Sequence, residues 1–175
     1  GELDRKMAVT VDLRGAVDYL RRRDDVDANR IGGLGLSVGG EAFLQTAAET
    51  RALGAVVSEG AGSRSVREDT INASLRTVPE IWFTGVMTAG TALFSNRLPP
   101  PNLKELAGRI ESTPVFFIYA TKGAGGEDNN PDYYEATPAP KQIWKIDTSH
   151  THGLSARPVE YERRVVDFFD RTLRG

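Results

Sequence analysis

Residues 35–39 place a serine hydroxyl in a pattern that is typical of nucleophilic catalysis. Gly35, Ser37 and Gly39 fit the spacing G-x-S-x-G, directly after a strand-length segment and directly before a helical one. In that context the serine occupies a strained turn that exposes its hydroxyl, and we expect both glycines to be needed because side chains there would clash. The amide of Val38, at the start of the helix, is expected to face an oxyanion that develops during acyl transfer.

Such a serine needs a base, and the chain has two histidines, His150 and His152. Both follow a predicted strand near the end of the chain. Two other interpretations are open from the residues alone. The histidines could belong to a polar loop with local hydrogen bonds, or they could bind a metal ion together with Asp147. Alternate histidines in a loop carry little coordination geometry, so we expect a base and neither a metal nor another cofactor.

A third residue, a carboxylate, should orient the imidazole of the base. Glu127 and Asp128 lie in the loop after a predicted strand and before the histidines, which is the chain order expected for this chemistry. Glu59, after another predicted strand, is a competing candidate. Adjacent acidic residues in a loop are more often exposed to solvent, and Glu59 could simply be a hydrogen-bonded residue at a strand end. The residues alone leave all three open.

The elements that position these side chains alternate along the chain. Four segments have the length and composition of buried strands, at residues 30–36, 52–58, 113–120 and 142–146. Helices are predicted between them, including residues 41–49 and an amphipathic helix that begins at Pro158. A first amphipathic helix is marked by apolar residues at three- and four-residue spacing, namely Val9, Leu13, Ala16, Val17 and Leu20. This alternation predicts an α/β fold with a parallel sheet flanked by helices.

Length and composition set the limits of that fold. The 175 residues suffice for one domain with a sizeable core, so residues 1–175 are expected to form a single domain. The formal charge of −2 and the lack of a basic stripe argue against a nucleic-acid partner. No cysteine is present, which excludes thiol nucleophiles and disulfides but leaves the compartment open. No stretch is apolar over the length that a membrane-spanning helix needs.

One segment is too long for a plain crossover between strands. Residues 63–109 are predicted to form a helical insertion, in which the apolar part at 81–98 resembles a lid over an acyl pocket. Such a lid would favour hydrophobic acyl chains. A core or interface helix explains the same apolar residues equally well, and Pro99, Pro100 and Pro101 mark the exit of the segment.

Taken together, the motifs resemble those of the α/β-hydrolase superfamily. The resemblance rests on Asp27-x-x-Arg30-Ile31-Gly32, on Gly35-x-Ser37-x-Gly39-Gly40, and on a late His150 before the final helix. It is most similar to the dienelactone hydrolase and prolyl-oligopeptidase-like esterase branch. The resemblance implies that His150 rather than His152 is the base. It also favours Glu127 over Asp128 as the acid, because Gly125, Gly126 and Glu127 resemble the acid loop of that branch.

The resemblance covers nearly the whole chain but only the C-terminal half of the family's fold. It starts at the helix before the fifth strand, so strands one to four and the loop that gives the second oxyanion donor are expected to lie elsewhere. The chain begins at Gly1 and has its first methionine at Met7, which suggests an internal or processed start. The edge at residues 31–36 would then be unpaired, and we expect it to bind an N-terminal half on a separate or cleaved chain, or a second copy of itself.

The resemblance implies a serine hydrolase that acts on ester or related small-molecule acyl substrates. Ser37 would attack, His150 would transfer the proton, Glu127 would orient the imidazole and the Val38 amide would bind the oxyanion. Two alternatives are kept. One is a non-catalytic interaction or scaffold module that retains the hydrolase framework, which the missing oxyanion loop favours. The other is an acyltransferase that uses the same acyl-enzyme with a different acceptor.

Overall fold

A computed structural model of the chain describes residues 5–65, 68, 78, 82, 85–86, 89–90, 93–94, 101–123 and 126–174, with side chains from residue 12 onward. The predicted insertion at 63–109, and with it the lid, lies outside the described residues except for its two ends and a few single positions. The described fold consists of the two segments on either side of this insertion.

The predicted parallel sheet is confirmed. Its strands are β1 (Gly32–Leu36), β2 (Ala55–Glu59), β3 (Val115–Lys122) and β4 (Lys141–Ser149), and they lie in the order β1-β2-β3-β4 with every neighbouring pair parallel. The fourth strand is longer than predicted. Its side chains alternate, since Lys145 and Asp147 are exposed while Ile146 between them is buried. An alternating strand with a polar outer face gives a weaker sequence signal than a continuous apolar run.

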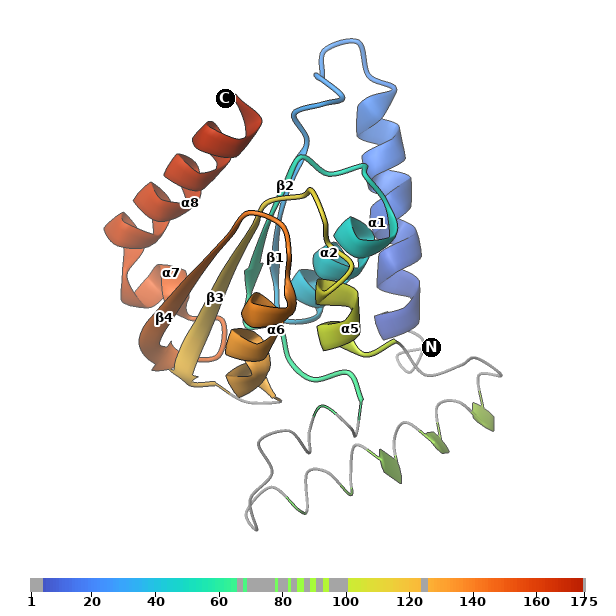
Figure 1. Cartoon of the computed structure of the whole chain (residues 1–175), viewed down its shortest axis with the longest axis vertical. Coiled ribbons are helices and arrows are strands. Elements are labelled where there is room, and N and C mark those ends of the chain that lie inside the picture. Colours follow the sequence, from blue (N-terminus) through green and yellow to red (C-terminus); the bar gives the residue numbers. More distant parts are fainter. Residues whose placement is uncertain are drawn as a thin grey trace.

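Helices cover the two faces of this sheet (Figure 1). On one face lie α1 (Arg5–Arg21), α2 (Val38–Glu49), α5 (Leu103–Ala107) and α6 (Asn130–Ala136), while α8 (Pro158–Leu173) covers the other. The short helices η2 (Glu127–Asn129) and α7 (Gly153–Ala156) follow the carboxyl ends of β3 and β4. Buried apolar side chains accordingly form two clusters, one on each face, of which the α8 side includes Phe116, Ile118 and Phe168.

Helix α2 begins at the position that the serine motif predicts, three residues before the segment 41–49 that was assigned as helical from its residues. Glycine is a poor helix former, and Gly39 and Gly40 lie in these first three residues. The structure nevertheless starts the helix at Val38, immediately after Ser37. The gain is close packing of α2 on β1 and β2, which overrides the local preference.

The β1 border of the sheet is open. Within the described residues β1 pairs with β2 alone, and its outward side chains Leu34 and Leu36 are 39% and 45% exposed. The helix beside this border, α1, buries Val17 fully, whereas Ala16, Tyr19 and Leu20 are exposed. Two members of the apolar face predicted for this helix, Ala16 and Leu20, are therefore exposed to solvent rather than buried in the core.

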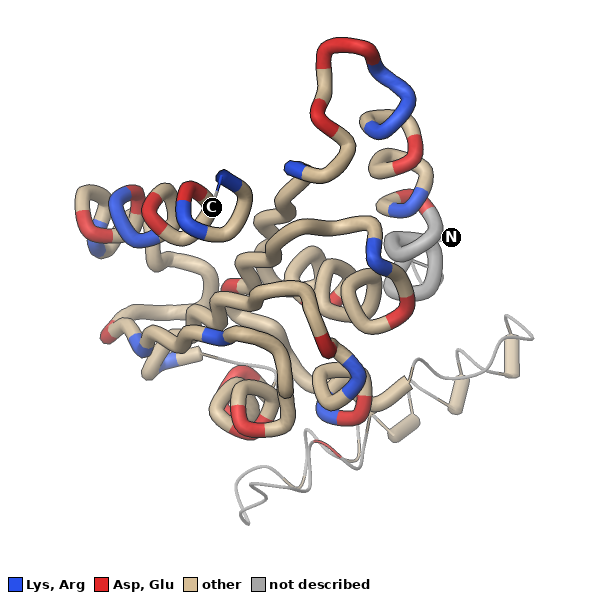
Figure 2. Tube along the Cα trace, turned by 45° about the horizontal axis from the view of Figure 1, so that its top comes forward, with Lys and Arg blue, Asp and Glu red and all other residues tan. Residues whose placement is uncertain are grey.

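Charged residues of both signs alternate along the described chain (Figure 2). On α8 they form ion pairs one helical turn apart, between Arg164 and Glu160, Arg163 and Asp167, and Arg174 and Asp170. None of the described helices combines the length and the apolar character that crossing a membrane requires.

Candidate active site

Ser37 occupies a sharp corner between β1 and α2. Its φ angle is 52°, in the left-handed region that residues other than glycine rarely adopt, so the turn is strained as expected. The Ser37 amide donates a hydrogen bond to the main-chain oxygen of Glu59 at 2.8 Å, which ties the corner to the end of β2. Ser37 itself is half-buried, so one side of the residue faces solvent.

Close packing at this corner requires Gly35 and Gly40. A Cβ on Gly35 would lie 2.5 Å from the main chain of Gly39, and one on Gly40 would lie 2.6 Å from the Ser58 hydroxyl oxygen. The described residues show no such contact at Gly39, where a Cβ would meet none of their atoms within 4 Å outside the helix's own backbone.

His150 approaches Ser37 from the far end of the chain. It follows β4, and its Nε2 lies 3.0 Å from the Ser37 Oγ although 113 residues separate the two. Thr151 has a φ angle of 55°, and this turn folds the chain back into α7 directly after the imidazole. Gly60, at the end of β2, packs against the ring: a Cβ there would lie 3.0 Å from the His150 Cε1. Gly40 belongs to the motif around Ser37, whereas Gly60 has no sequence signal and is identified only by packing between distant segments.

Glu127 contacts the other nitrogen of the same imidazole. Its Oε2 lies 2.7 Å from the His150 Nδ1, and its Oε1 accepts the Ala120 amide at 2.6 Å. The side chain is 1% exposed. A carboxylate can only accept, so the imidazole proton belongs on Nδ1, which leaves Nε2 free to accept a proton from the Ser37 hydroxyl.

Local contacts fix the loop that carries Glu127. Asn130 donates from its Nδ2 to the main-chain oxygens of Glu127 and Ala61, at 2.7 and 2.8 Å. Gly126, with a φ angle of 83°, packs so closely on Ser63 that a Cβ would lie 2.6 Å from its side chain. The loop is therefore attached to the segment after β2, which begins at Gly60 beside the His150 ring.

The remaining candidates lie outside this chain of hydrogen bonds. Asp128 is exposed on η2, and the Glu59 carboxylate accepts from the Gly153 amide and the Tyr161 hydroxyl. His152 is exposed, with its Nδ1 2.7 Å from the His150 main-chain oxygen. No three His, Asp or Glu side chains among the residues with described coordinates converge as metal ligands would. Of the predicted residues the structure thus brings together Ser37, His150 and Glu127.

The amide of Val38 lies in the first turn of α2. The first amides of a helix have no acceptor within the helix, and the helix dipole favours negative charge at that end. Val38, whose amide is the first of the helix, directly follows Ser37 in the sequence. Val38 is the first residue of α2, as expected for such a donor, and its role in binding an oxyanion stays a prediction.

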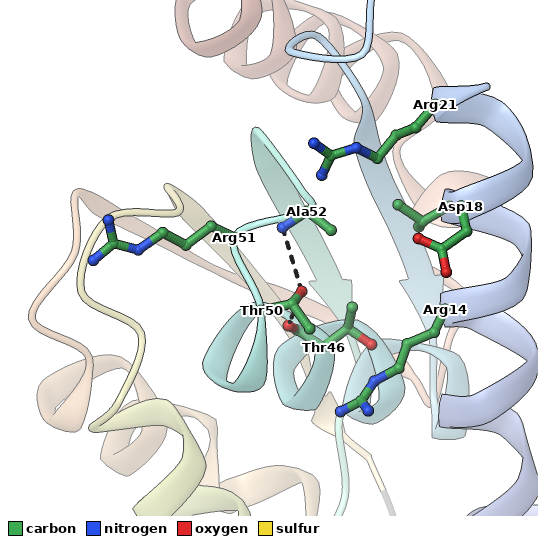
Figure 3. A pocket seen from close by; sticks show the side chains of 8 residues that line it. Arg14, Asp18, Arg21, Thr46, Thr50, Arg51 and Ala52 are labelled. Atoms are coloured by element: carbon green, nitrogen blue, oxygen red, sulfur yellow. Dashed lines mark hydrogen bonds between the residues drawn. The ribbon is translucent and has the colours of Figure 1, made fainter. Parts of the chain in front are cut away.

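A separate groove between α1 and the end of α2 has a volume of about 350 Å³ (Figure 3). It is lined by Arg14, Val17, Asp18, Arg21, Thr46, Thr50, Arg51 and Ala52. The twelve residues of α2 span about 18 Å, so this groove lies at the opposite end of the helix from Ser37. It takes no part in the arrangement around His150.

Comparisons with solved structures identify the fold. The chain is similar to the esterase Pf2001 of Pyrococcus furiosus, with a TM-score of 0.70 and 21% identity over 94% of this chain and 62% of that one. It is also similar to the acetyl xylan esterase of Paenibacillus sp. R4 (0.68, 20%, covering 94% and 52%) and to the acylaminoacyl peptidase of Pyrococcus horikoshii (0.68, 19%, covering 92% and 27%). No model of a protein family and no curated protein sequence matches the chain.

These neighbours are α/β hydrolases, and the chain spans 62% of the length of the Pf2001 esterase. The placement in the dienelactone hydrolase and prolyl-oligopeptidase-like branch stays a prediction. The order of the strands, the corner after β1 and the helices on both faces agree with the resemblance drawn from the motifs. The chain therefore has an α/β-hydrolase fold, of which it contains a four-stranded parallel part with its flanking helices.

Proposed function

We propose that this chain is the nucleophile-bearing part of a serine hydrolase that cleaves ester or related acyl bonds. One observation carries the proposal: a continuous hydrogen-bond chain runs from the Ser37 Oγ through the His150 imidazole to the buried Glu127 carboxylate, at 3.0 and 2.7 Å. Ser-His-acid sets of this geometry activate a hydroxyl for attack on a carbonyl. The hydrolase-like fold supports the same chemistry, although fold alone does not define an activity.

The proposed reaction starts with attack of the Ser37 Oγ on the acyl carbonyl. His150 takes the hydroxyl proton on Nε2 and gives it to the leaving group, so that an acyl-enzyme forms. Water then attacks the acyl carbonyl, and His150 takes a proton from this water and returns it to the Ser37 Oγ as the acid product leaves. Glu127 holds the ring in the required tautomer and stabilises the imidazolium. The Val38 amide donates to the oxyanion.

The second oxyanion donor is proposed to come from outside this chain. In well-studied serine proteases the loss of one such donor costs about 2.7–4 kcal/mol of transition-state stabilisation. We propose that an N-terminal half, on the same natural polypeptide or on a separate one, pairs with the open β1 border and brings this donor beside Ser37. The exposed Leu34 and Leu36, and the neighbours' greater length, support this placement.

A fluorophosphonate probe tests the proposed nucleophile, because it reacts covalently with an activated serine. We expect labelling of one residue, Ser37, identified by peptide mass analysis, and none in Ser37→Ala. In a complete enzyme the same substitution should lower turnover by about 10⁶, as in subtilisin. An unlabelled wild-type chain, or labelling that persists in Ser37→Ala, would refute the proposal and favour the scaffold interpretation.

A further inference from the structure

Glu59 is a buried carboxylate that the proposed reaction does not use. It is the last residue of β2 and is 3% exposed. Its Oε1 accepts the Gly153 amide at 2.9 Å and its Oε2 accepts the Tyr161 hydroxyl at 2.6 Å. A buried carboxylate is stable only when it is paired or hydrogen-bonded, and each oxygen here has a donor.

These contacts join two parts of the candidate site. The main-chain oxygen of Glu59 accepts the Ser37 amide at 2.8 Å. Its side chain binds Gly153, three residues after His150 and 94 residues away in the chain. The next residue, Gly60, lies against the His150 ring. One short segment at the end of β2 therefore contacts both the serine corner and the loop that carries the imidazole.

The second contact connects this segment to α8. Burial, and then the hydrogen bond to Glu59, raise the pKa of the Tyr161 hydroxyl, so it stays protonated and donates well above neutral pH. Gly153 leaves room for the carboxylate, because a Cβ there would lie 2.7 Å from the Glu59 Oε1 and 3.0 Å from the Tyr161 ring. The fit among Glu59, Gly153 and Tyr161 is tight enough to determine where α7 starts.

We propose that Glu59 is a positioning residue, which holds the His150 loop at hydrogen-bonding distance from Ser37; this role rests on the proposed function. The carboxylate is not the acid of the reaction, since the His150 Nδ1 already contacts Glu127. It acts instead through Gly153, as a fixed acceptor on β2 that determines how far the loop after β4 can move. A displacement of a reacting group by about 1 Å can slow a reaction by roughly 10²-fold, so this anchor affects rate as well as stability.

Substitutions at Glu59 separate the two effects. In Glu59→Gln the amide oxygen still accepts from Gly153 and the amide nitrogen donates to the Tyr161 oxygen, so the rate of fluorophosphonate labelling should stay within about threefold of wild type. In Glu59→Ala both contacts are lost, and the rate should fall by roughly 10²-fold. Tyr161→Phe keeps the Gly153 contact and should give a smaller loss.

A second readout follows the imidazole itself. The chain has only two histidines, so the spectrum of His152→Gln assigns the Nδ1 proton of His150 by nuclear magnetic resonance. We expect this signal to be retained in Glu59→Gln, and to be weakened or shifted in Glu59→Ala and Tyr161→Phe. It reports the contact with Glu127 without any turnover.

Glu68 provides the matched control. It is 0% exposed, and its carboxylate accepts the amides of Leu103 and Lys104 at the start of α5 and of Arg64, with no hydrogen bond to the His150 loop among the described contacts. Glu68→Ala should lower the melting temperature as much as Glu59→Ala while labelling and the His150 signal remain unchanged. Equal behaviour of the two alanine variants in all three measurements would overturn the proposal.

If Glu59→Ala does not fold, Tyr161→Phe with unchanged labelling and an unchanged His150 signal would overturn it in the same way. A wild-type chain that is not labelled refutes the proposed hydrolase but leaves the imidazole signal as a test of Glu59. The two failures are therefore distinguishable.

Discussion

The two borders of the sheet are packed very differently. At the β4 side, the exposed side chains include the charged Lys145 and Asp147, and the Trp144 ring centroid lies 6.2 Å from that of Tyr161 on α8. At the β1 side, α1 fully buries one of its described side chains, Val17, and β1 exposes both of its outward leucines. Within the described residues each end strand pairs with one neighbour, but β4 exposes charged side chains where β1 exposes apolar ones.

The candidate site likewise has two parts, one proposed to transfer protons and one proposed to bind the oxyanion. The groups proposed to move protons, His150 and Glu127, follow β4 and β3 and are fixed by contacts with Ala120, Gly60 and the Glu59 anchor. The groups proposed to bind the oxyanion lie on the open side, where this chain offers the Val38 amide. We propose that this chain's own residues prepare proton transfer, and that a further segment completes the binding of the oxyanion.

The largest expected effect comes from removing the groups that are proposed to transfer protons. His150→Gln should lower fluorophosphonate labelling of Ser37 by about 10⁶, and Glu127→Gln by about 10⁴, because the first removes the base and the second its correct tautomer. Labelling rates measured against time will show both. His152→Gln is the control and should stay near the wild-type rate; equal losses in the two histidine variants would contradict the assignment of His150.

The next effect concerns the interior between the two borders. Arg64 lies in the segment after β2 and pairs with Glu41 on α2 at 3.3 Å, with both side chains nearly fully buried. Burial lowers the pKa of Arg64, while Glu41 opposes that shift. Arg64→Met should reduce the free energy of unfolding by about 3–5 kcal/mol, measured with a chemical denaturant, because Glu41 loses its cationic neighbour.

The surface pair between Arg14 and Glu49 is the matched control for this charge pair. Its side chains are 45% and 30% exposed. Arg14→Met should therefore change the free energy of unfolding by no more than about 1 kcal/mol. A similar loss in both variants would mean that burial does not determine the strength of these pairs.

Alanine substitutions at the two glycines of the motif are expected to change the free energy of unfolding in opposite directions. Gly35→Ala forces a Cβ against the main chain of Gly39 and should cost about 1–3 kcal/mol in the free energy of unfolding. Gly39→Ala enters open space and should stabilise this chain by up to about 1 kcal/mol through better helix propensity. If Gly39→Ala destabilises the chain as much as Gly35→Ala, the corner differs from the one described here.

The smallest effect should come from the open border. Leu34→Lys adds a charge to an unpaired strand and should weaken self-association, or binding of an N-terminal half, by about fivefold, since half burial of a leucine contributes on the order of 1 kcal/mol. Analytical ultracentrifugation measures the change. Val166→Lys, at a 49% exposed position on α8, is the control; an equal effect there would argue against β1 as the interface.

Local signals in the sequence predicted much of the sheet and the serine corner. The glycine spacing around Ser37, between a strand and a helix, describes one continuous segment whose geometry depends on near neighbours. The parallel arrangement also followed, because alternating strands and helices leave few other topologies. The boundaries of β4 were less predictable, since packing against other elements decides them.

The rest of the site depends on contacts between distant residues. Two adjacent acids gave no local reason to expect that Glu127 is buried and Asp128 exposed, and only the resemblance separated them. The partners of Glu59 lie 94 and 102 residues further along the chain, so no window of sequence could assign them. In the sequence Glu59 is thus a candidate for the acid, whereas in the structure its carboxylate binds Gly153 and Tyr161.

Four consecutive parallel strands each contribute one group at their carboxyl ends: Ser37 after β1, Glu59 on β2, Glu127 after β3 and His150 after β4. No single hairpin or helix pair contains the whole set. Partial melting of any one strand would separate its group from the others, so we expect thermal inactivation to coincide with cooperative loss of the sheet. Reactivity of Ser37 would then serve as a sensor of the integrity of the entire strand array.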